Sequence, residues 1–145
     1  MDSNKKEPKI LEDVKINIKI KLSALWVAVM FLYIYVDYFA LYIPGLIEQL
    51  IAGEVAFTGI QINQLSLLGF MILMTIPILM VFLSLILKPK VNRWTNIIVG
   101  ILYIVVAVGG MIGESWAFYL FGSIVEVVLL SLIVWYAWKW PKQEA

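Results

Sequence analysis

The chain has 145 residues, of which 63% are apolar and only 14% are charged. Soluble domains carry about 25% charged residues, so this composition excludes a soluble globular domain, a disordered chain and a nucleic-acid-binding protein. The absence of Cys excludes disulfides, and the absence of His removes the commonest general base and transition-metal ligand. The composition predicts a small integral membrane protein without a metal or other cofactor.

Four segments are long and apolar enough to cross a bilayer as helices. A spanning helix needs about 20 mostly apolar residues, because the hydrocarbon core is about 30 Å thick and each residue rises about 1.5 Å. The apolar runs are continuous, whereas the strands of a membrane barrel alternate. We therefore predict an all-α, antiparallel four-helix transmembrane bundle, with spans at Leu22–Leu41, Leu65–Leu87, Trp94–Ile112 and Phe118–Trp138.

The spans and their connections form one predicted membrane domain, residues 22–140, between tails at residues 1–21 and 141–145. The first tail is ambiguous. Its apolar residues alternate with Lys and Asn up to Leu22, as in a strand, but Ile10, Val14 and Ile18 also fit one helical face. A lone strand has no partner here, so we favour a loose or helical segment at the membrane surface.

The link between the first and second spans is long. Apolar residues recur in it with the spacing of a short amphipathic helix, which we expect to end near Gly53. Residues 58–64 are too mixed in character to assign. The last two spans are separated by so few residues that they must form an antiparallel hairpin.

Charge is distributed unevenly among the predicted loops. All 11 basic residues fall on one side of the four spans, in the two tails and in the loop that contains Lys88, Lys90 and Arg93. The two opposite loops contain only acidic charges. The positive-inside rule therefore predicts that both termini are cytoplasmic, and we expect the tryptophans of that side to mark the inner boundary; they are Trp26, Trp94, Trp135, Trp138 and Trp140.

Two acidic residues lie inside predicted spans, Asp37 in the first and Glu126 in the fourth. A carboxylate inside a membrane is costly, so it is a functional hypothesis by default. Both residues fall in the outer half at similar depths. If the first and fourth helices are neighbours, the two carboxyl groups can meet and share a proton. The alternative, which we weigh about equally for each acid alone, is a structural hydrogen bond between helices.

Polar residues at the same depth suggest a pocket that opens outward. Tyr33 lies one turn from Asp37 and is placed to donate to it, and Ser123 lies close to Glu126. Asn63 and Gln64 precede the second span on the same outer side. Three glycines are candidates for close helix packing within the chain: Gly109 and Gly113, which form a GxxxG pattern, and Gly122.

Pro77 is expected to kink the second span, because proline cannot bond to the carbonyl of Leu73. We expect the Thr75 hydroxyl to help satisfy that carbonyl. The basic loop before the third span fits a topology signal and a helix start, with Asn92 as a candidate cap. A site for anionic lipid headgroups is the less favoured interpretation of this loop.

Several motifs together resemble a known family. They are Leu22-Ser23-Ala24-Leu25-Trp26, Tyr33-x-Tyr35-x-Asp37, Asn92-Arg93-Trp94-x-Asn96 and the aromatic run from Trp135 to Trp140. From about Val14 to Trp140 the chain resembles an uncharacterised family of small bacterial four-span membrane proteins, a domain of unknown function. The resemblance implies this topology in a bacterial membrane and implies no activity.

Three functions follow as hypotheses. The first is proton-coupled or small-solute handling through Asp37 and Glu126, for which four spans would require a homodimer. The second is a structural or accessory role, with a partner membrane protein or lipid bound to the bundle. The third and least favoured is an intramembrane enzyme, since neither acid sits in a recognisable catalytic motif.

Overall fold

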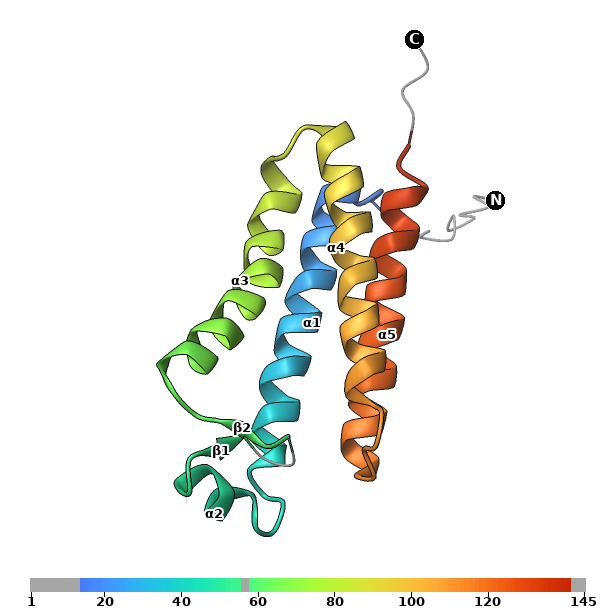
Figure 1. Cartoon of the computed structure of the whole chain (residues 1–145). Coiled ribbons are helices and arrows are strands. Elements are labelled where there is room, and N and C mark those ends of the chain that lie inside the picture. Colours follow the sequence, from blue (N-terminus) through green and yellow to red (C-terminus); the bar gives the residue numbers. More distant parts are fainter. Residues whose placement is uncertain (1–13, 56–57, 142–145) are drawn as a thin grey trace, which may run out of the picture.

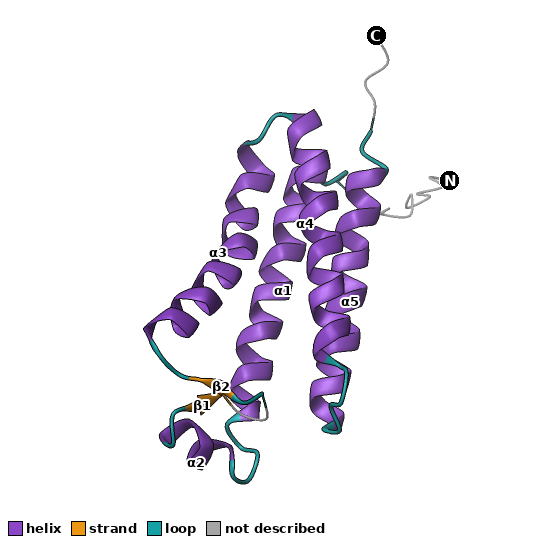
Figure 2. Cartoon of the chain, in the orientation of Figure 1, coloured by secondary structure: helices purple, strands orange, loops and turns teal. Residues whose placement is uncertain are grey.

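The computed structural model describes residues 14–55 and 58–141, and within these ranges the chain is almost entirely helical (Figures 1 and 2). Its long helices are α1 (Ile18–Ala40), α3 (Gln64–Ile86), α4 (Pro89–Gly110) and α5 (Ala117–Trp138). Each has 22 or 23 residues and the apolarity of a membrane span, which gives about 33–35 Å of axial rise. The four predicted spans are confirmed. Most of the two predicted tails lies outside the described residues.

The long helices pack as an up-and-down bundle (Figure 1). α4 and α5 form the most extensive contact, which confirms the predicted hairpin, and α1 packs against both α3 and α5. α3 contacts α4 far less, and the N-terminal half of α3 diverges from the other helices (Figure 1). The first and fourth spans are therefore neighbours, which was the condition for Asp37 and Glu126 to share a site.

The helix α1 begins four residues before the predicted span. The Asn17 side chain accepts a hydrogen bond of 2.9 Å from the backbone N–H of Lys19, so Asn17 caps the helix. The Lys19 ammonium donates to two carbonyls at the C-terminal end of α3, at 3.2 Å to Leu85 O and 2.8 Å to the O atom of the C-cap residue Leu87. These bonds satisfy carbonyls that have no partner within α3. From Ile18 onward the helical interpretation of the tail is confirmed.

The helix α4 also begins earlier than predicted, at Pro89, with Lys88 as its N-cap. Proline suits the first helical position because its missing N–H would have no helical partner there. The prediction that Asn92 caps this helix is wrong. Asn92 is fully buried one turn inside α4, and its Nδ2 donates to the Ser84 carbonyl at 2.6 Å.

The link between α1 and α3 holds the predicted short helix and an unpredicted hairpin. The helix α2 (Leu46–Ile51) follows Gly45, whose φ of 84° favours glycine. Two short antiparallel strands come next, β1 (Glu54–Val55) and β2 (Ile60–Gln61). The hairpin returns the chain to the start of α3 (Figure 2).

Charge divides the bundle into two ends. The start of α1, the α3–α4 turn and the end of α5 share one end (Figure 1); we call this the basic end, because the seven described Lys and Arg residues lie there. Glu48, Glu54 and Glu114 lie in the links at the other, acidic end. Separation of the two charges along the bundle agrees with the predicted asymmetry. Which end faces the cytoplasm stays a prediction.

A buried polar cluster joins three helices near the basic end. Trp26, which was predicted near the inner membrane boundary, has a fully buried side chain, and its Nε1–H donates to Asn96 Oδ1 at 2.7 Å. The Ser84 hydroxyl donates to the same oxygen at 3.3 Å, and Asn96 Nδ2 donates to Asn92 Oδ1 at 2.7 Å. We call these four residues of α1, α3 and α4 the asparagine network.

Candidate functional site

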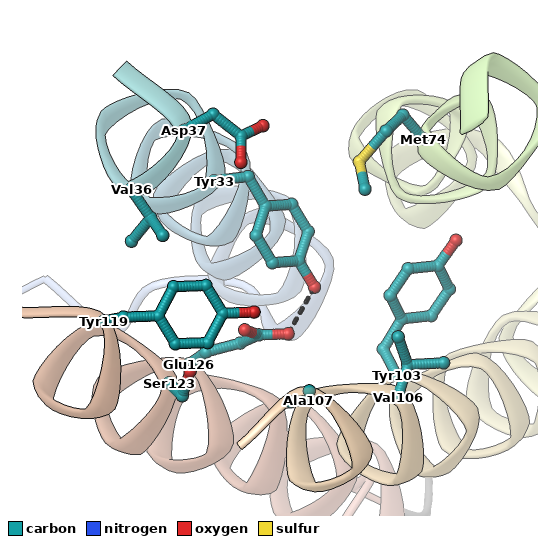
Figure 3. A pocket seen from close by; sticks show the side chains of 11 residues that line it. Tyr33, Val36, Asp37, Met74, Tyr103, Val106, Ala107, Tyr119, Ser123 and Glu126 are labelled. Carbon is teal, nitrogen blue, oxygen red and sulfur yellow. Dashed lines mark hydrogen bonds between the residues drawn. The ribbon is translucent and has the colours of Figure 1, made fainter. Parts of the chain in front are cut away.

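A cavity of about 180 Å³ lies in the half of the bundle nearer the acidic end. All four long helices supply its walls, and Figure 3 shows the side chains that line it. The lining residues are Tyr33, Val36, Asp37, Met74, Tyr103, Val106, Ala107, Gly110, Tyr119, Ser123 and Glu126. The cavity therefore contains both acids that the sequence singled out, together with three tyrosines.

Glu126 is the most buried acid of this site, with 8% of its surface exposed. The Tyr33 hydroxyl donates to Glu126 Oε1 at 2.5 Å across the contact of α1 with α5 (Figure 3). No described residue donates to Oε2. We had expected Tyr33 to donate to Asp37, and this bond does not form. Side chains on a helix lean toward its N-terminus, so the Tyr33 ring leans away from Asp37 and reaches α5.

Asp37 lines the same cavity but is bonded to none of the residues that the structure describes, and its side chain is exposed. It also lines a second hollow of about 520 Å³ between the α1–α3 link and the α4–α5 turn. The two hollows share Asp37, Gly110 and Tyr119, so they meet at these residues. We call the second hollow the vestibule. The acids share a cavity, but no hydrogen bond joins them.

The other predicted pocket residues divide into two groups. Ser123 is buried and lines the cavity. Asn63 and Gln64 line neither the cavity nor the vestibule. Asn63 instead caps α3, since its side chain accepts from the backbone N–H groups of Leu65 and Ser66 while the Ser66 hydroxyl accepts from the Asn63 N–H. A helix cap and a pocket residue look alike in sequence, because both are polar residues before an apolar run.

Glycine packs helices closely at one of the three predicted positions. A Cβ added to Gly122 would lie 2.7 Å from Val36 Cγ2, so Gly122 lets α5 approach α1 beside the cavity. Gly109 has open space around it, and Gly113 is a turn residue with a φ of 82°. The predicted GxxxG contact within the chain is therefore wrong. Gly100, which was not predicted, allows α4 to approach Val134 of α5.

Pro77 lies inside α3 and leaves the Leu73 carbonyl without a helical partner. The hydroxyl of Tyr103, from α4, donates to that carbonyl. The prediction that Thr75 serves this carbonyl is wrong, since its hydroxyl donates to Met71 O at 2.7 Å. The Tyr103 ring is a wall of the cavity as well (Figure 3). One residue thus connects the proline of α3 with the site.

Comparison with known proteins identifies the group to which the chain belongs. A family model described as a family of unknown function, DUF6326, matches residues 9–145. The chain is a member of this family. The predicted resemblance to an uncharacterised family is confirmed. No curated protein and no solved structure matches the chain.

Sequence reasoning about this DUF6326 member missed Tyr103 and Tyr119 as cavity residues. A signal for Tyr103 was present. The freed carbonyl at Leu73 needs a donor, and a tyrosine lies near the middle of the adjacent span. Tyr119 lies near the start of the fourth span, where aromatic residues commonly mark a membrane boundary, so its sequence position gives no signal for a cavity. Gly110 leaves room for its ring, since a Cβ there would lie 3.1 Å from the Tyr119 hydroxyl oxygen.

The cavity combines two carboxyl groups and four hydroxyl groups with apolar side chains. Val36, Met74, Val106 and Ala107 make much of its wall apolar. Such a wall strengthens the interaction of Glu126 with a proton or a cation, because the local dielectric is low. Among the described residues no group of three or more acids is arranged to hold a metal ion. The chemistry that these side chains can perform is protonation and the binding of a small molecule.

Proposed function

We propose that this protein resides in a bacterial inner membrane, where it binds a small solute in the Glu126 cavity and couples that binding to the movement of a proton. One observation supports this best. Glu126 is more than nine-tenths buried near the middle of a membrane-spanning helix, bonded to Tyr33 alone among the described residues and open to a cavity on its other side.

The cost of the buried acid supports an exchange mechanism. A charged side chain at the centre of a membrane helix costs about 2.5–3.5 kcal/mol on insertion scales. A proton or a bound ligand can offset this cost, and the Tyr33 hydroxyl stabilises the carboxylate between these states. A carboxyl group that alternates between a proton and a ligand couples their movements, as in secondary transporters.

The two ends of the bundle support access from one side. The vestibule leads to the cavity at the acidic end, and the asparagine network fills the core near the basic end. Under the positive-inside rule the acidic end faces outward and both termini are cytoplasmic. Four helices provide few walls for a complete path through the membrane, so we propose that two copies of the chain form the transporting unit.

The orientation can be tested directly, because the chain has no Cys of its own. Single cysteines would be placed in the α4–α5 turn (Ser115→Cys) and at the basic end (Lys90→Cys). In intact cells we expect a membrane-impermeant maleimide to label the first variant alone, and both variants after lysis. Labelling of Lys90→Cys in intact cells would contradict the proposed orientation.

Coupling can be tested in vesicles that contain the purified protein and a trapped pH-sensitive dye. A pH gradient is imposed, and a panel of solutes without a transferable proton is added: quaternary ammonium ions, polyols and sulfonates. We expect one class to accelerate the loss of the gradient in the wild type. Glu126→Gln should abolish this acceleration, since it keeps the shape of the side chain but removes the titratable proton.

The matched control is Glu48→Gln, which neutralises an exposed carboxylate of α2 outside both hollows. It should behave as the wild type does. If no solute class accelerates the loss of the gradient, or if Glu126→Gln responds like the wild type, the proposed coupling is wrong.

A second candidate function, an accessory protein that binds lipid, is favoured by Arg93. Its guanidinium lies near the rings of Trp138 and Trp94, with 5.5 and 5.9 Å from Cζ to the ring centroids. Its Nε is buried without a hydrogen-bond partner in the described part of the chain. A hollow of about 290 Å³ beside it is also lined by Lys90 and Trp140. Basic pockets at this depth suit anionic headgroups.

The lipid that is retained through purification tests this candidate. The accessory function predicts that phosphatidylglycerol is retained over phosphatidylcholine, and that Arg93→Gln removes the preference. Lys139→Gln is the matched control, because Lys139 also lies over a tryptophan at the basic end. Equal retention of both lipids by the wild type would argue against this role.

A further inference from the structure

Every ionisable group that lines the cavity and the vestibule is an acid or a tyrosine. The acids are Glu126 in the cavity, Asp37 where the hollows meet and Glu114 in the vestibule. No Lys or Arg lines either hollow, and the seven basic residues of the described ranges are at the other end of the bundle. A path lined by charge of one sign attracts ligands of the opposite sign and repels those of the same sign.

The hydrogen-bond donors of the cavity are nearly all in use. The Tyr33 hydroxyl donates to Glu126, and the Tyr103 hydroxyl donates to the Leu73 carbonyl. The surrounding backbone N–H groups belong to helices and are bonded within them. Only the hydroxyls of Tyr119 and Ser123 remain among the lining side chains. An anion or a sugar needs several donors, so the cavity is poorly suited to either.

The main hydrogen-bond acceptor of the cavity, in contrast, is not fully used. Glu126 is more than nine-tenths buried, and its Oε2 accepts no hydrogen bond from any described residue. Aromatic faces add to this negative character, because a tyrosine ring attracts a cation placed over it, and methylated ammonium groups are recognised in this way. The rings of Tyr33, Tyr103 and Tyr119 come from three different helices and border the same space (Figure 3).

Size limits the ligand further. The cavity is about 180 Å³, somewhat larger than an apolar cavity of about 150 Å³ that holds benzene. A compact head with a few methyl groups fits such a space, and its apolar surface matches Val36 and Met74. The vestibule, at about 520 Å³, has room for a longer substituent.

We propose that the cavity binds a small organic cation, a methylated ammonium group that lies against Glu126 among the three tyrosines and enters past Asp37. This inference rests on the proposed function, for which it names the substrate class. The cation and the proton compete for the same carboxylate, so binding of one releases the other.

Three probes of similar shape and different charge test the proposal: tetramethylammonium, tert-butanol and pivalate. The full chain is purified in detergent, and its melting temperature is measured against the concentration of each probe. We expect tetramethylammonium alone to raise the melting temperature, with a smaller increase at low pH, where protons compete. In weakly buffered solution its binding should release protons.

Glu126→Gln should weaken tetramethylammonium binding about tenfold or more, the effect of losing one favourable charge interaction. Glu48→Gln, the exposed control, should bind as the wild type does. Asp37→Asn provides a second variant, because Asp37 has no described hydrogen bond to lose on substitution. It should fold normally and bind the cation several-fold more weakly. Equal responses to the three probes, or unchanged binding in both variants, would overturn the proposal.

The outcome separates this inference from the proposed function. If tetramethylammonium binds through Glu126 but no solute moves protons in vesicles, the cation site stands and the coupling is wrong. If a polyol or a sulfonate moves protons through Glu126 while tetramethylammonium does not bind, the coupling stands and the substrate class is wrong.

Discussion

The two ends of this bundle use polar side chains in opposite ways. Near the basic end, the asparagine network is fully buried and its side chains are bonded to one another. In the half nearer the acidic end, Glu126 has one described partner, Asp37 has none, and a cavity lies between helices. Satisfied polar groups hold helices together, whereas unsatisfied ones keep binding capacity. Under the proposed function, stability and ligand binding thus depend on different ends of the bundle.

The largest effect on stability is expected at the network. Asn96→Leu removes the acceptor of Trp26 and Ser84 and leaves buried polar atoms of α1 and α3 without partners. We expect the free energy of unfolding to fall by about 1–3 kcal/mol. Denaturation of the protein in mixed micelles measures the change. The control is Thr95→Val, which loses only a hydrogen bond within α4. Equal losses of stability in the two variants would contradict the stabilising role of the asparagine network.

Gly122→Ala is the next test, because it acts where α1 and α5 meet beside the cavity. The added methyl group would lie 2.7 Å from Val36 Cγ2, and such overpacking costs about 1–3 kcal/mol. Gly109→Ala faces open space and should be neutral or stabilising by up to about 1 kcal/mol. Adding Val36→Ala should restore the stability of Gly122→Ala. If Val36→Ala does not restore stability, Gly122 does not serve the close approach of α5 to α1.

A smaller effect is expected where Tyr103 connects the cavity to α3. Tyr103→Phe leaves the Leu73 carbonyl unpaired and should cost about 0.6–1.7 kcal/mol, the range from the mean to the maximum for hydrogen bonds between membrane helices. Pro77→Ala supplies the missing backbone N–H, so Tyr103→Phe should cost little in that background. A double-mutant cycle measures the coupling between the two sites. An additive cycle would show that the tyrosine does not serve this carbonyl.

The smallest effect on stability is expected for the two acids themselves. Gln at position 126 can still accept the Tyr33 hydrogen bond, and it removes a costly carboxylate from the membrane. We expect Glu126→Gln and Asp37→Asn to melt at or above the wild-type temperature, as substitutions at functional sites often do. If both melt well below it, the acids are structural, and the accessory function is favoured over proton coupling.

The sequence predicted the membrane part of the fold well because that part depends on local composition. Length and apolarity alone identify α3 and α5, and the spacing of Leu46 to Ile51 identifies α2. Prediction failed where one residue type serves several purposes. Asn92 is a residue type that is common at helix caps, but it occupies a core position. Only the early start of α4, at Pro89, distinguishes these two roles.

The candidate site was predicted in part. Depth along the helices placed Asp37, Glu126 and Ser123 together, since rise per residue is regular. It could not give the direction of Tyr33 or the arrival of Tyr103 at Leu73, because both depend on which helices are neighbours. Nor could it show that Asn63 is used at a helix start. Contacts between helices are therefore the information that the sequence of a single chain lacks.

The hydrogen bond from Tyr103 to Leu73 has a mechanical consequence. In an ordinary helix the backbone itself holds each carbonyl, but at Pro77 the side chain of another helix does so. The same ring borders the cavity. Any molecule that displaces the ring also releases the carbonyl, so occupancy of the cavity and the shape of α3 are thermodynamically linked, and each alters the other by the same free energy. Through Tyr103, a ligand in the cavity would therefore change the conformation of α3 over the length of that helix.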